Sequence, residues 1–381
     1  MKPIYLDYAA TTPVDPRVIA RMLEFLGEDA QFGNPASRSH AYGWLAEEGV
    51  ETARRQVADV LRCDVREVVW TSGATESNNL AIKGAAQANV QRGRHLVTAT
   101  SEHKAVLDCF RWLEKQGFEV TWLAPQADGQ VAIDDLRAAL RPDTTLVSLM
   151  HANNETGVIN DIAALGTLCR ANGTLFHVDA AQTAGKLPLD LSVLPVDLLS
   201  LSAHKFYGPK GVGVLYVRRH ADVRIDAQIH GGGHERGLRS GTLASHQVAG
   251  LGEALTLAAE RMEQDADHIG ALRDRLWQSL SALPGVLLNG HPVARLPGHL
   301  NVAFTGVDGD LLITALNHVA ISSGSACTSA SVEPSHVLTA MGFGRDRALS
   351  SLRISLGRYT TAEQTQEVIR HIAETLVALK T

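Results

Sequence analysis

Three short apolar runs in this sequence end in polar residues whose chemistries complement one another. The first leads into Thr71 to Glu76 just before a helical segment, where free backbone N–H groups, the helix dipole and the Thr75 hydroxyl favour a phosphate. Asp179 follows the second run, and Lys205 follows the third, beside a turn rich in glycine and proline. A phosphate cradle, an anion for a pyridinium nitrogen and an amine for an aldehyde are what pyridoxal 5'-phosphate requires. The sequence therefore predicts a pyridoxal-phosphate site.

Each of these features also has a purely structural interpretation. The segment from Thr71 to Glu76 is compatible with an ordinary N-capped helix, and a lysine is most often a solvated surface charge. A dinucleotide loop is a poor interpretation of Gly208 to Gly213, because this stretch lies between two predicted strands and lacks a following helix. His230 and His234 are four residues apart in a glycine-rich, non-helical segment, 230–237, so a metal pair is not expected. That segment either lets backbone approach a ligand or partner closely or is a flexible connection.

The elements that must position these residues follow an alternating pattern. Short β-branched runs alternate with longer segments of helical period, which is typical of parallel strands with helices on the sheet faces. Helices are predicted at 78–88 and 105–116. The predicted strands are 68–70, 95–98, 120–123, 146–150, 175–178, 198–202 and 213–217. This pattern predicts an α/β fold with a mostly parallel seven-stranded sheet in a large domain, residues 16–257.

The remaining residues, 1–15 and 258–381, predict a smaller α+β domain. A charged helical stretch runs from about Ala258 through Leu280. A strand at 300–304, a helix at 310–317 and a terminal helix at 361–380 follow it. Thr360 to Glu363 has the spacing of a capping box for the last helix.

Composition excludes several classes of protein. The chain has 381 residues, long enough for two domains, and 35 basic against 41 acidic residues give a net charge of −6. This mild acidity leaves no electrostatic footprint for direct binding of nucleic acid. The sequence contains no apolar run of signal-peptide or membrane-spanning length. We therefore expect a soluble, cytoplasmic protein.

The four cysteines are far apart and predict neither a disulfide framework nor an intrinsic metal site. Cys63, Cys109 and Cys169 are expected to be small buried hydrophobic residues. Cys327 differs, because the segment 322–331 around it has almost no apolar bulk and should form an exposed, mobile loop.

Ordered motifs over nearly the whole chain resemble those of the cysteine desulfurases of the NifS/IscS type, which are class-V aminotransferases. The resemblance implies a fold-type I pyridoxal-phosphate-dependent transferase. The motifs are Tyr5 to Pro13, Phe32 to Ser37, Thr71 to Asn78, Glu102-His103, Asn153 to Glu155, His177 to Asp179, Ser202 to Lys205, Arg236 to Thr242, Ser322 to Ser329 and Arg353 to Ser355.

The resemblance also implies roles for individual residues. Lys205 would form the Schiff base with the cofactor and then transfer protons. Asp179 would pair with the pyridinium nitrogen, Gln182 would hydrogen-bond the ring hydroxyl, and His103 would lie over the ring and shuttle protons. Asn154 would lie beside cofactor and substrate, and Arg353 would hold the substrate carboxylate through a bidentate pair.

The phosphate would be bound from two subunits, so that a homodimer is expected. The residues implied for it are Ala74, Thr75, Ser202 and His204 of one subunit and Thr242 of the other.

The implied reaction removes sulfur from L-cysteine, releases L-alanine and leaves a persulfide on Cys327. That sulfur would pass to an acceptor protein for iron–sulfur cluster assembly or for thiolation of tRNA or another molecule, and Cys327 could transiently ligate a [2Fe-2S] cluster. Alternatives are selenocysteine cleavage, transamination, sulfur supply for nitrogenase maturation or DNA phosphorothioation, and a cofactor-free scaffold in which Cys327 only tethers partners. The chain ends at Thr381, where the housekeeping IscS branch carries a further tail that docks its scaffold protein. A different acceptor and weaker delivery to the same one are both compatible with this end.

Overall fold

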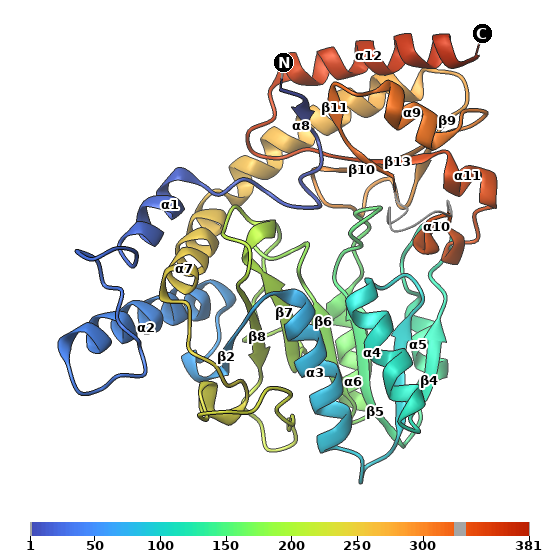
Figure 1. The fold of residues 1–381 in the computed structure, drawn as a ribbon. Helices are drawn as coiled ribbons and strands as arrows, with labels where there is room; N and C mark the ends of the chain where they lie inside the picture. Colours follow the sequence, from blue (N-terminus) through green and yellow to red (C-terminus); the bar gives the residue numbers. More distant parts are fainter. Residues whose placement is uncertain (1, 324–332, 381) are drawn as a thin grey trace.

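A seven-stranded sheet forms the centre of the larger part of the protein (Figure 1), and it confirms the predicted α/β class. The computed structural model describes residues 2–323 and 333–380. The strand order is β2-β8-β7-β6-β5-β3-β4, and only β8 runs antiparallel to its two neighbours. The strands are β2 (Val68–Thr71), β3 (His95–Ala99), β4 (Glu119–Leu123), β5 (Thr144–Met150), β6 (Leu175–Asp179), β7 (Leu198–Ser202) and β8 (Gly213–Val217).

Helices cover both faces of this sheet because successive strand residues point to opposite sides. Leu96, Leu146 and Leu198 pack with α3 and α4 on one face. The next residue of each of these strands, such as Val97, packs with α2, α5, α6 and α7 on the other. The helices are α1 (Pro16–Leu23), α2 (Ala41–Leu61), α3 (Ala74–Ala88), α4 (Lys104–Lys115), α5 (Ile133–Ala139), α6 (Ile162–Ala171) and α7 (Ser245–Glu260).

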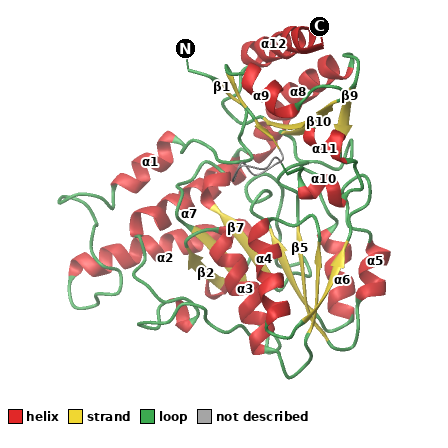
Figure 2. Cartoon of the chain, turned by 45° about the vertical axis from the view of Figure 1, so that its right-hand side comes forward, coloured by secondary structure: helices red, strands yellow, loops and turns green. Residues whose placement is uncertain are grey.

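A second apolar core lies above the carboxyl ends of these strands (Figures 1 and 2). It packs α8 and α12 against a four-stranded antiparallel sheet of order β12-β13-β10-β9. The domain boundary placed between residues 257 and 258 stays a prediction. The remaining elements are β1 (Ile4–Tyr5), α8 (Met262–Ser281), β9 (Val286–Asn289), β10 (His299–Phe304), α9 (Gly309–Ala315), β11 (Val319–Ala320), β12 (Ser322–Ser323), α10 (His336–Ala340), α11 (Arg345–Leu349), β13 (Ser351–Ser355) and α12 (Ala362–Lys380).

Several predicted details were wrong for identifiable reasons. Helix α3 begins at Ala74 instead of residue 78, because Gly73 takes a φ of 148° and lets the chain turn directly into the helix. Ser322 and Ser323 are not loop residues, since they pair with β13. The capping box of α12 is shifted by one residue: Thr361 Oγ1 accepts from Gln364 N, and Gln364 Oε1 accepts from Thr361 N.

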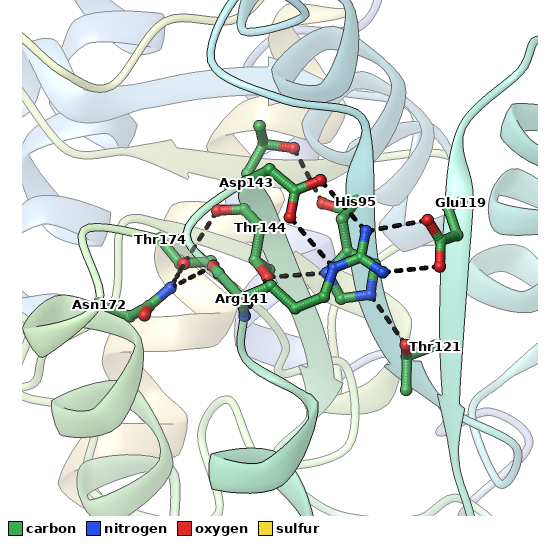
Figure 3. A network of polar contacts seen from close by, with 9 residues as sticks. His95, Glu119, Thr121, Arg141, Asp143, Thr144, Asn172 and Thr174 are labelled. Carbon is green, nitrogen blue, oxygen red and sulfur yellow. Dashed lines mark hydrogen bonds and ion pairs between the residues drawn. The ribbon is translucent and has the colours of Figure 1, made fainter.

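A polar network closes the amino ends of β3, β4 and β5 (Figure 3). The two ring nitrogens of buried His95 contact Thr144 Oγ1 at 2.7 Å and Thr121 Oγ1 at 2.8 Å. Arg141 forms a bidentate pair with Glu119, at 2.7 and 2.9 Å, and also contacts Asp143. The polar groups at this end of the sheet form hydrogen bonds and ion pairs with one another. The cavity that could hold a ligand lies at the opposite end.

Within the described residues, no helix is both long enough and apolar enough to cross a membrane.

Candidate active site

A cavity of about 570 Å³ lies at the carboxyl ends of the parallel strands, where open α/β sheets bind ligands. Residues from both parts of the fold line it, including Ala9 and Ala10 near the N-terminus and Arg353 on β13. The sequence-predicted residues that it brings together are Ala74, Thr75, His103, Asn154, Asp179, Gln182, Ser202, His204, Lys205 and Arg353.

Lys205 ends a single 3-10 turn, Ala203–Lys205, directly after β7. Its Nζ donates to Ala9 O at 2.7 Å and to Ala10 O at 2.8 Å, so the N-terminal segment holds the amine in place. Burial lowers the pKa of Lys205 to about 8; Arg353 lowers it further, and Asp179 and Asp7 oppose that shift. The neutral fraction near neutral pH is therefore larger than that of an ordinary lysine, and the neutral amine is the form that attacks an aldehyde.

Asp179 is the last residue of β6 and is buried at 7% exposure. Asn78 Nδ2 donates to its Oδ2 at 2.7 Å, and the backbone N of Ala181 donates to its Oδ1 at 2.9 Å. These bonds fix the orientation of the carboxylate. A fixed anion at this point suits a protonated ring nitrogen.

The first turn of α3 points into the same cavity without a side-chain cap, so the backbone N–H groups of Ala74 and Thr75 are available to an anion. The N–H of Ser72 is already taken by Glu76 Oε2, at 2.8 Å. His204 Nδ1 contacts Thr11 Oγ1 at 3.1 Å, and burial lowers the pKa of His204 to about 4. His204 is therefore a neutral hydrogen-bonding group at this end of the cavity.

The remaining polar groups are oriented by the backbone. His103 caps α4, with its Nδ1 accepting from Ala105 N at 3.1 Å, so a proton that this ring exchanges belongs to Nε2. Desolvation lowers the pKa of His103, and Asp179 opposes this effect. Gln182 Nε2 donates to Ala9 O at 2.9 Å. Asn154 Oδ1 is buried with no partner among the described residues.

Arg353 is not free to rotate. Its Nη1 donates to Asn154 O at 3.0 Å and its Nη2 to Asp7 Oδ1 at 2.7 Å. Both terminal nitrogens therefore keep hydrogens for a further acceptor. The sequence prediction of a bidentate substrate pair did not anticipate these two contacts.

These residues fit pyridoxal phosphate. An amine, a fixed carboxylate, an uncapped helix N-terminus and an unpartnered buried amide oxygen line one cavity, and their chemistries suit the aldehyde, the ring and the phosphate of this cofactor.

Two predicted site residues are not in this cavity. Thr242 follows the glycine-rich segment, is exposed and is not among the residues that line the cavity. Cys327 lies outside the described residues. The nearest described residue before it, Ser323, is in β12 beside Leu352 of β13. On the C-terminal side of Cys327 in the sequence, His336 Nε2 contacts Glu102 O at 2.9 Å, and Glu102 precedes His103.

Sequence reasoning missed several residues of the site, namely Asp7, Ala9, Ala10 and Asn78. All four lie inside motifs that the family resemblance contains, and that was the available signal. Spacing carries no information about them, because their roles arise from contacts across the fold, such as the one between Ala9 and Lys205.

Comparisons with known proteins agree with this geometry. The family model of the class-V aminotransferases matches residues 4–368. The chain belongs to this family, and it is a pyridoxal-phosphate-dependent enzyme.

The relatives define its activity more narrowly. The chain is 56% identical over 378 residues to the cysteine desulfurase IscS of Shewanella sp. strain ANA-3, covering 99% of this chain and 94% of the relative. IscS of Shewanella baltica strain OS223 matches equally. A solved NifS-like protein superposes with a TM-score of 0.92 at 39% identity, over 99% of this chain and 100% of the other. DndA from Streptomyces lividans superposes with a TM-score of 0.80 at 44% identity, over 93% of this chain and 99% of the other. These likenesses support cysteine desulfurase function.

Proposed function

We propose that this enzyme transfers the sulfur of L-cysteine to Cys327 and releases L-alanine, using Lys205, Asp179, His103 and Arg353. The C–S bond of the substrate breaks and an S–S bond to Cys327 forms, so that one cysteine and one thiol give one alanine and one persulfide. The observation that carries this proposal is the convergence of the Lys205 amine, the Asp179 carboxylate and the α3 N-terminus on one cavity with Arg353.

Each residue has a task that follows from its surroundings. The cofactor, when bound, supplies an electron sink for the substrate carbon next to the amino group. Lys205 accepts the proton from that carbon, because burial keeps part of its amine neutral. Asp179 keeps a proton on the ring nitrogen, and Arg353 holds the substrate carboxylate with its remaining Nη hydrogens. His103 moves a proton at Nε2, the nitrogen that the helix cap leaves free.

Replacing Cys327 tests the sulfur-carrying step. Cys327→Ala should bind the cofactor and change the visible spectrum with cysteine, yet release no sulfide in the presence of a thiol. Cys63→Ala is the matched control: burial raises the pKa of this thiol to about 12, and we expect wild-type turnover. Full desulfuration by Cys327→Ala would overturn the assignment, and amino-group transfer without sulfide would indicate a transaminase.

We further propose that the active unit is a homodimer whose interface includes α1, α2 and the loop between them. Large apolar side chains there are exposed, among them Leu23 at 59%, Tyr42 at 55% and Trp44 at 56%. A cluster of this kind on a folded protein marks an interaction surface. We propose that a second copy of the chain covers this surface. In such a dimer, the exposed Thr242 of one subunit would bind the cofactor phosphate in the other subunit.

We propose a cytoplasmic location and a protein acceptor for the persulfide. Transfer of radiolabelled sulfur from Cys327 to candidate acceptors tests the destination. Preference for an iron–sulfur scaffold protein would place the enzyme in cluster assembly, and preference for a sulfur-relay protein would place it in thiolation.

A further inference from the structure

An ion pair in the wall of the cavity joins the two ends of the chain. Asp7 Oδ1 lies 2.7 Å from Arg353 Nη2, and the two side chains are 19% and 11% exposed. The proposed function gives Arg353 a role in substrate binding and leaves Asp7 without one.

We propose that Asp7 is a positioning residue that orients the Arg353 guanidinium for the substrate carboxylate and so contributes to selection of α-amino acids over simple amines. This inference rests on the proposed function of Arg353. With Nη1 held by Asn154 O and Nη2 held by Asp7, the guanidinium plane is defined by two fixed acceptors. A guanidinium that is already held in place loses less conformational freedom on binding a carboxylate than a mobile arginine side chain does.

The position of Asp7 is itself fixed. Tyr5 Oη donates to Asp7 O at 3.0 Å and to Thr11 O at 2.9 Å, which holds the turn after β1. Asp7 also forms a β-bridge with Ser355. Ser355 lies on the same strand as Arg353, two residues further on. Arg353 is part of β13 and Asp7 is bridged to the end of the same strand, so this strand fixes the position of both members of the ion pair.

The charge of Asp7 matters as well as its geometry. Arg353 lowers the pKa of Lys205, and Asp7 raises it, so the carboxylate offsets part of the effect of the guanidinium on the nearby amine. An arginine without this partner would disturb the residue that attacks the cofactor. Asp7 thus allows the cationic Arg353 side chain to lie close to the Lys205 amine.

The test compares two competitive inhibitors of the holoenzyme that differ only in a carboxylate, alanine and ethylamine. Asp7→Asn keeps the size of the side chain and removes its charge. We expect its inhibition constant for alanine to rise about tenfold, the effect of weakening one charge-assisted contact, while that for ethylamine changes less than twofold. The KM for cysteine should rise, and kcat should fall by a smaller factor, because Asp7→Asn also removes the charge that offsets Arg353 at Lys205. Asp108→Asn, on the exposed face of α4, is the control and should match wild type.

Arg353→Ala separates failure of this inference from failure of the proposed function. It should raise the alanine constant more than Asp7→Asn does, and adding Asp7→Asn to it should cause no further change. If Arg353→Ala weakens alanine but Asp7→Asn does not, the role of Asp7 is overturned. If Arg353→Ala has no effect on alanine, the carboxylate-binding role of Arg353 itself is wrong. Should Asp7→Asn not fold, Asp7→Glu displaces the guanidinium while keeping the charge, and an unchanged alanine constant would then refute the inference.

Discussion

Asn78 Nδ2 donates a 2.7 Å hydrogen bond to Asp179 Oδ2 beneath the cavity. Asn78 lies one helical turn after Ala74, whose N–H group faces the phosphate end of the same cavity. Helix α3 therefore contributes to two parts of the cavity: its N-terminus presents backbone N–H groups without a side-chain cap, and its next turn orients the carboxylate.

Asn78→Ala should weaken cofactor binding because it leaves one oxygen of buried Asp179 without a donor. Loss of a hydrogen bond to a charged group costs about 1.5–3 kcal/mol, which corresponds to a rise of roughly tenfold or more in the dissociation constant. Titration of the apoenzyme with pyridoxal phosphate measures this dissociation constant. Gln87→Ala, at the exposed end of the same helix, should bind normally; equal affinity of Asn78→Ala and wild type would show that Ala181 alone holds the carboxylate.

Glu155 makes stability depend on pH. It is 5% exposed and accepts a hydrogen bond from Ser335 Oγ, and burial raises its pKa from 4.5 to about 7. The folded state therefore binds more protons than the unfolded state between these values, and stability falls as pH rises through this window, by up to about 3 kcal/mol. Glu155→Gln removes this loss. Its melting temperature should equal that of wild type at pH 5 and exceed it by several degrees at pH 8.

Glu263→Gln, on the exposed surface of α8, is the control for this experiment and should follow wild type at both pH values. A constant difference between Glu155→Gln and wild type across the pH range would mean that Glu155 does not titrate in this window.

Leu23→Asp places a charge in the exposed apolar surface of α1 and α2. If that surface joins two copies, the variant should sediment as a monomer at concentrations where the wild type is a dimer. Its cofactor affinity should fall too, because Thr242 then reaches no partner. Val193→Asp changes a side chain that is 71% exposed elsewhere and should remain dimeric. A dimeric Leu23→Asp variant would exclude this surface.

Glu235 and Arg54 form a buried ion pair, with side chains 4% and 5% exposed and contacts of 2.8 and 2.9 Å. Glu235 also accepts from Trp70 N at 2.9 Å, which ties the glycine-rich segment to β2. Glu235→Gln should cost about 2–3 kcal/mol, because it removes the charge of the buried partner and leaves Arg54 only Glu51, whose side chain is 44% exposed. Glu119→Gln breaks the exposed bidentate pair of Figure 3 and should change the melting temperature little. Equal effects of the two variants would contradict the role of burial.

The sequence was sufficient for the sheet because its strands are short, largely apolar runs, such as Val214 to Tyr216, which are typical of strands buried on both faces. It also predicted that Asp179 and Lys205 lie at the carboxyl edge of the sheet, since Asp179 ends one strand and Lys205 comes three residues after another. The contacts of Glu235 could not be foreseen, because a glutamate in a glycine-rich segment gives no sign that Arg54 lies opposite. The role proposed for Thr242 depends on a second copy of the chain, about which the periodicity of one chain carries no information.

The ties of the N-terminal segment to β13 set when this enzyme can become active. Ala9 N donates to Ser355 Oγ at 2.9 Å, and Asp7 pairs with Arg353 across 346 positions of sequence. At roughly 5–20 residues per second, a ribosome needs tens of seconds to reach that strand. The cavity of a nascent chain therefore cannot be completed before β13 has been synthesised. Binding of the cofactor to the complete cavity must follow the synthesis of almost the whole chain.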